Sequence, residues 1–127
     1  LALTVITRRK YDAVPVLTVS AFEVKADVQS LTEPFFQALS YSRFADYCYL
    51  AAPREAGWAP EVRQLAERFG VGLVEFDDAT KWCTYRLTPG TPMHPDPKLR
   101  ETFIDAAFGS AKDQLLIRRN LLGQKAP

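Results

Sequence analysis

The stretch Val16-Leu-Thr-Val-Ser-Ala-Phe-Glu-Val-Lys25 is an apolar run that ends in a carboxylate and an ammonium group. Because side chains alternate along a β-strand, a strand here places Glu23 and Lys25 together on one largely apolar face. Charge on such a face is costly unless it is paired or binds a ligand. The stretch therefore predicts a strand with a polar site at its carboxyl end.

A second carboxylate, Asp12, lies upstream across a short apolar stretch. Two carboxylates can hold Mg²⁺ on a phosphodiester, where the ion activates water and neutralises charge. The ammonium of Lys25 suits orientation of that water or stabilisation of the developing charge. We therefore expect Asp12, Glu23 and the carbonyl oxygen of Val24 as metal ligands, and Asp12, Glu23 and Lys25 as the catalytic group of a nuclease.

Glu-x-Lys alone is a weak signal, because Asp96-Pro97-Lys98 also fits an acidic-x-Lys pattern within a proline-rich connector. The context of Glu23 and Lys25 is stronger, since they end an apolar strand that a helix follows. Gln37 and Tyr41 on that helix are four residues apart and share one face. We expect both to support the site through hydrogen bonds.

The remaining pattern predicts a mixed β-sheet flanked by helices on both faces, with a C-terminal helical extension. Thr32 is the expected N-cap of the first helix, and Gly70 and Gly109 are expected helix ends. Strands are expected over residues 1–7, from 12 through a bend at Pro15 into 16–25, and over 47–52, 71–76 and 81–87. Helices are expected over residues 32–44, 60–69, 98–108 and 111–122.

Composition bounds the organisation of the chain. With 127 residues, 47% hydrophobic and 12% aromatic, one compact domain is expected, divided into a core over residues 1–88 and a connector with C-terminal helices over 89–127. The chain starts at Leu1 rather than methionine, so we expect a processed product, a domain or part of a larger protein.

The net charge of +1 argues against binding nucleic acid by bulk charge alone. Two basic clusters remain as candidate phosphate contacts: Arg8-Arg9-Lys10 and Arg118-Arg119.

Cellular context is indicated mainly by absent signals. No apolar run is long enough to span a membrane, and no signal-type segment starts the sequence. Cys48 and Cys83 fit neither a metal motif nor a disulfide framework, so we expect two buried free thiols and a cytoplasmic location. A lone His94 makes histidine-based zinc sites or a catalytic triad improbable.

The order of these motifs resembles the PD-(D/E)xK nuclease superfamily, which has the restriction-endonuclease-like fold. The resemblance covers about residues 1–77, and the Gln37-x-x-x-Tyr41 element resembles that of RecB-like nucleases. It implies DNA as the substrate, Mg²⁺ or Mn²⁺ as the cofactor, and metal-binding roles for Asp12 and Glu23 with Lys25 assisting the attacking water. Tyr11 stands in place of the proline of that motif, and no helix precedes the first strand in this sequence.

Other interpretations stay open at this point. Glu23 and Lys25 also fit a surface ion pair at a strand end, with Asp12 in an unrelated turn. A catalytically inactive nuclease-like module for DNA binding or complex assembly is the main alternative function, with a partner protein or a homodimer. A hydrolase of another phosphate ester is a third reading, because these residues do not encode the substrate.

Overall fold

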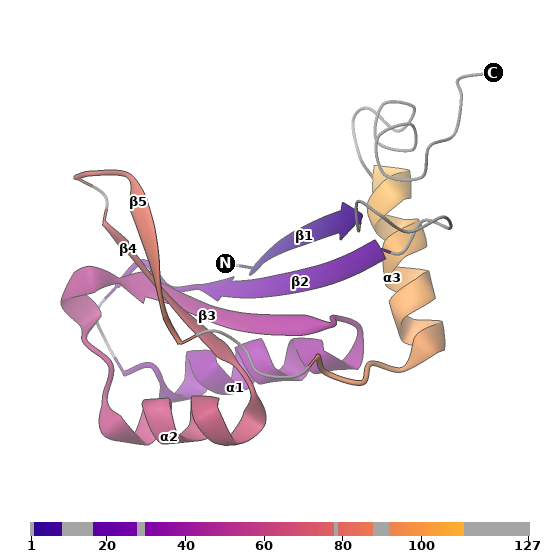
Figure 1. The fold of residues 1–127 in the computed structure, drawn as a ribbon. Coiled ribbons are helices and arrows are strands. Elements are labelled where there is room, and N and C mark those ends of the chain that lie inside the picture. The colour runs from indigo at the N-terminus through magenta and orange to yellow at the C-terminus, as the bar shows by residue number, and fades with distance from the viewer. Residues whose placement is uncertain (1, 9–16, 28–29, 78, 88–91, 111–127) are drawn as a thin grey trace.

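The structure, a computed structural model, describes residues 2–8, 17–27, 30–77, 79–87 and 92–110 (Figure 1). Within these ranges the chain forms strands, α-helices and two short 3₁₀ turns. In chain order they are β1 (Ala2–Arg8), β2 (Leu17–Val24), α1 (Thr32–Ser40), the 3₁₀ turn Tyr41–Arg43, β3 (Tyr47–Pro53), the 3₁₀ turn Arg54–Ala56, α2 (Pro60–Phe69), β4 (Gly72–Asp77), β5 (Trp82–Leu87) and α3 (Pro97–Ser110).

The described strands form one mixed sheet whose spatial order follows the chain, β1-β2-β3-β4-β5. β2, β3 and β4 are parallel to one another, whereas β1 and β5 pair antiparallel at the two edges. Parallel neighbours need crossover connections, and α1 and α2 provide them. The predicted α/β class and mixed sheet are therefore confirmed, and the restriction-endonuclease-like assignment stays a prediction.

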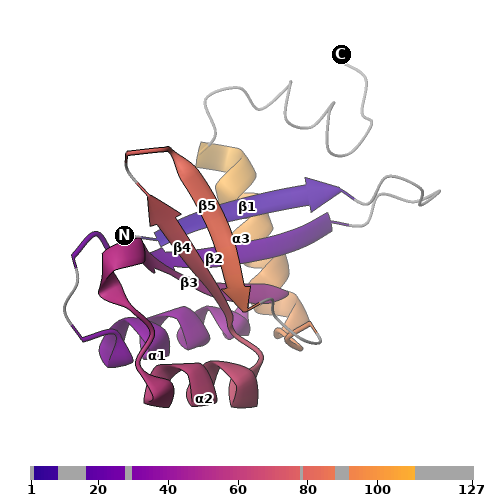
Figure 2. The ribbon, with the colours of Figure 1, turned by 60° about the vertical axis from the view of Figure 1, so that its left-hand side comes forward.

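Both crossover helices pack on the same face of the sheet, below it in Figures 1 and 2. Phe35 and Ala38 of α1 and Val62 and Ala66 of α2 are at most 2% exposed, so each helix buries part of its apolar surface against the sheet. Phe36 of α1 and Phe69 of α2 remain 50% and 40% exposed. These side chains belong to the core whose sheet members include Val19, Ala21, Cys48, Leu50, Ala52 and Leu73.

The opposite face of the sheet carries no helix within the described ranges, which corrects the prediction of helices on both faces. Successive right-handed crossovers that advance in one direction along a sheet place their helices on one side. The rings of Phe22 and Tyr49 stack there with centroids 4.4 Å apart, and Tyr49 meets Tyr85 edge-on at 5.9 Å. Leu3 and Val5 of β1 lie beside them, and we call these five residues the open face. The predicted helix over residues 111–122 lies outside the described residues.

Asp46, immediately before β3, joins three elements of the fold. Its backbone and carboxylate both bond Val19 of β2: Asp46 N donates to the Val19 carbonyl, and Val19 N donates to Asp46 Oδ2, each at 2.8 Å. Arg100 of α3 donates to both carboxylate oxygens, with Nη2 3.0 Å from Oδ2, and also to the Leu17 carbonyl. α3 also stacks Phe103 on Phe44 at 4.2 Å. α3 is thereby fixed to the ends where β2 and β3 begin.

The helix ends agree only in part with those expected from the sequence. α2 spans Pro60–Phe69 as predicted and ends at Gly70, whose φ of 73° lies in the left-handed region that glycine favours. Thr32 is the first residue of α1 rather than its N-cap: Leu31 takes the cap position, and no side chain caps the helix there. α3 runs through Gly109 to Ser110, so the break predicted at Gly109 is wrong. No helix in the described ranges is long and apolar enough to cross a membrane.

The two cysteines differ in environment, although both were expected to be buried. Cys48 is fully buried on β3, and burial raises the pKa of its thiol to about 12, which keeps it protonated at physiological pH. Cys83 is exposed on β5. The reason is its position on an edge strand, where even apolar side chains receive cover from one neighbour only.

Replacing Asp46 by alanine should lower the free energy of unfolding by about 2–3 kcal/mol, because Arg100 and the Val19 N–H lose their shared acceptor. Urea denaturation measures this change. A double-mutant cycle with Arg100→Ala should show clear coupling, since the two side chains are 20% and 26% exposed.

The control is the more exposed ion pair between Arg86 and Glu75, whose arginine is 49% exposed. Arg86→Ala should cost less than about 1 kcal/mol. Equal effects of Asp46→Ala and Arg86→Ala would contradict the structural role of Asp46.

Candidate active site

The carboxyl end of β2 carries the predicted Glu-x-Lys element. Parallel pairing sets Glu23 beside Leu50 and Val24 beside Ala51 of β3. Lys25 follows the strand, and its backbone N–H still donates to the Ala51 carbonyl at 2.9 Å. Both charged residues are thus held in register by the central strand.

Glu23 is a buried carboxylate, 5% exposed, and it accepts a hydrogen bond from the hydroxyl of Tyr41. Tyr41 follows α1 directly. Its hydroxyl therefore reaches a residue of β2, the strand that precedes this helix. Burial raises the pKa of Tyr41 to about 12, with the hydrogen bond to Glu23 and its negative charge contributing next. Tyr41 is therefore a neutral donor across the physiological pH range. The Glu-x-Lys strand and the Gln-x-x-x-Tyr element are therefore in contact through Glu23 and Tyr41, and the expected support of catalysis stays a prediction.

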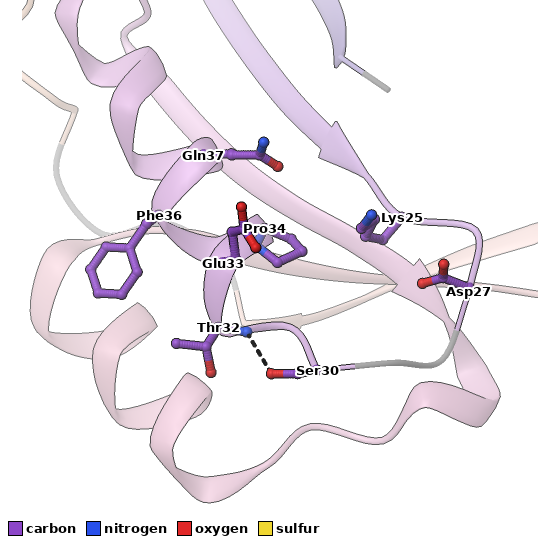
Figure 3. A pocket seen from close by; sticks show the side chains of 8 residues that line it. All are labelled: Lys25, Asp27, Ser30, Thr32, Glu33, Pro34, Phe36 and Gln37. Atoms are coloured by element: carbon purple, nitrogen blue, oxygen red, sulfur yellow. Dashed lines mark hydrogen bonds between the residues drawn. The ribbon is translucent and has the colours of Figure 1, made fainter.

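Lys25 lines an open cleft of about 580 Å³ between the end of β2 and the start of α1 (Figure 3). Glu33 and Gln37 of α1 lie on the Lys25 side of the helix, and Asp27 lies beyond Lys25. Phe36 points away from Lys25. The other lining residues are Ser30, Thr32 and Pro34.

Glu23 and Tyr41 are not among the residues that line this cleft. The Glu23 carboxylate is turned into the protein toward Tyr41, whereas Lys25 and Gln37 face the cleft. The site therefore has two parts, a buried carboxylate with its tyrosine and an open polar cleft beside it.

Sequence reasoning did not include Glu33 and Asp27 among the site residues. Glu33, Gln37 and Tyr41 are spaced by four, so one helix face presents all three toward the end of β2. The sequence shows that spacing. However, Glu33 fits equally well as an acidic residue that stabilises the first turn of the helix through its dipole. Asp27 carried no periodic signal, because it follows the strand in a bend.

Asp12 lies outside the described residues, as do Arg9 and Lys10. The residues that flank this segment, Arg8 and Leu17, pair with each other at one end of the β1–β2 ladder. Glu23 is at the other end, six strand residues from Leu17, or about 20 Å at the usual rise of a strand. The residue paired with Glu23 on β1 is Ala2.

Of the residues proposed to contact substrate, the structure therefore brings together Gln37 and Lys25 but not Arg8. Arg8 is at the far end of β1 from Ala2, the residue beside Glu23. A role of Arg8 in phosphate binding at the same site would need a substrate that extends along the sheet.

Metal-binding capacity is limited within the described part of the chain. No group of three or more histidine, cysteine, aspartate or glutamate side chains is close enough there to hold a metal ion. The expected ligands Asp12, Glu23 and the Val24 carbonyl are all oxygen donors, which suit Mg²⁺ or Mn²⁺ rather than zinc. Mg²⁺ commonly uses one or two carboxylates and keeps several waters. Of the expected ligands, Glu23 and Val24 lie together at the end of β2, and Asp12 lies outside the described residues.

In comparisons with known proteins, the chain matches no protein family, no curated protein and no solved structure. The resemblance to PD-(D/E)xK nucleases therefore depends on the motif residues and on how they are arranged.

Replacing Tyr41 by phenylalanine should lower the free energy of unfolding by about 2 kcal/mol at neutral pH, because the buried Glu23 loses a donor. The wild-type protein should also lose stability as the pH rises from about 10 toward 12. The pKa of Tyr41 is raised in the folded protein from 10.0 to about 12, so Tyr41 ionises at a lower pH in the unfolded chain than in the folded one. Stability that depends on the protonated phenol is therefore lost over this range. Urea titrations over this pH range measure the effect.

Tyr85→Phe is the matched control, since its ring is 54% exposed on the open face. Tyr41→Phe should show a smaller alkaline loss of stability than the wild type, and Tyr85→Phe should behave like the wild type. An unchanged alkaline profile in Tyr41→Phe would contradict the assigned hydrogen bond.

Proposed function

We propose that this chain is a metal-dependent nuclease domain that hydrolyses the phosphodiester bonds of DNA, with Glu23 and Lys25 at the reacting centre. The observation that carries the proposal is that two sequence motifs meet. Glu23 of β2 accepts a hydrogen bond from Tyr41, which follows α1. Lys25, which follows β2, lines the same cleft as Gln37 of α1.

Hydrolysis of a phosphodiester needs a nucleophilic water, neutralisation of phosphate charge and stabilisation of the leaving oxygen. A bound Mg²⁺ or Mn²⁺ would neutralise phosphate charge and lower the pKa of water. Glu23, Val24 and Asp12 are the residues that would hold it. Tyr41 keeps the Glu23 carboxylate oriented, because it donates to one of its oxygens.

Lys25 and Gln37 supply the groups that face the substrate. The ammonium of Lys25 lies in the open cleft, where it can donate to a phosphate oxygen or orient the attacking water. The amide of Gln37 can donate to phosphate or to Lys25's neighbours without adding charge. DNA as the substrate follows from the family resemblance alone.

A catalytically inactive nuclease-like module is the second candidate. Two observations favour it: Glu23 is 5% exposed, and Arg8 and Leu17, the described residues on either side of the segment that contains Asp12, pair at the far end of β2 from Glu23. In such a module, Glu23 and Tyr41 form a buried structural pair, and the cleft binds DNA or a partner without hydrolysis.

A cleavage assay on DNA with Mg²⁺ or Mn²⁺ tests the leading proposal. Glu23→Gln and Lys25→Ala should each reduce the cleavage rate about 100-fold or more, the usual size of a lost catalytic group. RNA serves as the second substrate in the same assay.

Lys98→Ala is the matched control, because Lys98 belongs to the other acidic-x-Lys sequence. There, Asp96 Oδ1 accepts the N–H groups of Lys98 and Leu99 and so caps α3. Lys98→Ala should cut like the wild type. Full activity of Lys25→Ala and Glu23→Gln would refute the nuclease proposal.

Calorimetric titration with Mn²⁺ separates the two candidates. A nuclease should bind the ion, and both Glu23→Gln and Asp12→Asn should weaken that binding at least tenfold. No binding, or binding that neither substitution alters, would favour the inactive module.

A further inference from the structure

The two edges of the sheet differ in how they are protected. Edge strands expose unpaired backbone groups, and monomeric proteins usually guard them with charge, proline or a bulge. The pairing of β4 with β5 shifts register: Leu73 of β4 pairs with Leu87, and the next residue, Val74, pairs with Tyr85. Arg86 is therefore an extra, charged residue on β5. β5 therefore has both a bulge and a charge on the edge.

β1 has no bulge, and its one charged residue is Arg8 at its carboxyl end. Among the described residues it pairs only with β2, in an unbroken register from Ala2–Glu23 to Arg8–Leu17. Its first six residues, Ala-Leu-Thr-Val-Ile-Thr, contain no charge and no proline. Leu3 is 53% exposed and Val5 is 39% exposed. A seven-residue strand of this kind is suited to pairing with another strand.

β1 is also complementary to itself. An antiparallel pair centred on Val5, the middle of the strand, sets Leu3 beside Thr7 and Thr4 beside Ile6 of the other copy. No like charges face each other in that register, and β-branched pairs are favourable across strands. The Leu3 and Val5 side chains would then continue the open face, next to Phe22, from one copy to the other.

We propose that β1 is a homodimer interface: two copies of this chain pair antiparallel through their β1 edges and form one continuous sheet. The partner is a second copy because this register sets β-branched side chains opposite one another and places Arg8, the one charged residue of β1, beside Ala2 of the other copy rather than beside a like charge. Nucleic acid is a poor partner for this surface, since neither the open face nor residues 2–7 carry a lysine or arginine. The proposal is independent of the nuclease assignment.

Sedimentation velocity of the full chain tests the proposal. The wild type should sediment as a dimer. Val5→Lys should give a monomer, because it sets two ammonium groups against each other at the symmetry axis. Thr84→Lys makes the same kind of change on β5 and should leave the dimer intact. Circular dichroism verifies that each variant is folded.

Cross-linking tests the register separately. In a Cys83→Ser background, Val5→Cys should form an intermolecular disulfide under mild oxidation, whereas Thr84→Cys should not. A monomeric wild type, a dimer that survives Val5→Lys, or a dimer that Val5→Cys does not cross-link would each overturn the proposal.

Discussion

Asp46 and Lys25 fix the two ends of the parallel pairing between β2 and β3, and the candidate site depends on that register. At one end Asp46 bonds Val19 twice and receives Arg100 from α3. At the other end Lys25 continues the ladder by donating to Ala51. α1 connects the two strands, and Tyr41, which follows α1, donates a hydrogen bond to the Glu23 carboxylate.

A buried carboxylate at the end of an apolar strand is expensive unless donors satisfy it. Tyr41 meets this need for Glu23, and burial together with the contact to Glu23 raises the pKa of Tyr41, so the phenol stays protonated. The open cleft beside Glu23 carries Lys25, Gln37, Glu33 and Asp27. A satisfied carboxylate next to an accessible ammonium is useful to a phosphodiesterase and equally stable in a protein that only binds. The distinction between these functions depends on whether an ion reaches Glu23.

Sequence patterns predicted the elements whose signal is local. The alternation up to Lys25, the spacing in α2 and the stop at Gly70 each determine structure within a few residues, and β2, α2 and β5 agree with them. The sequence placed Tyr41 near the Glu-x-Lys strand, but it did not predict that Glu23 is the partner of the Tyr41 hydroxyl. The Asp46–Arg100 contact spans 54 residues and has no local pattern. The uncovered sheet face was missed because composition does not show on which side a crossover helix lies.

Diffraction from crystals grown with Mn²⁺ is the most direct test of the claim that Glu23 belongs to a metal site. If Glu23 is a metal ligand, an anomalous difference peak lies within coordination distance of its carboxylate, and Glu23→Gln removes it. No peak at Glu23, or one that remains unchanged in Glu23→Gln, would contradict a metal-binding role of Glu23.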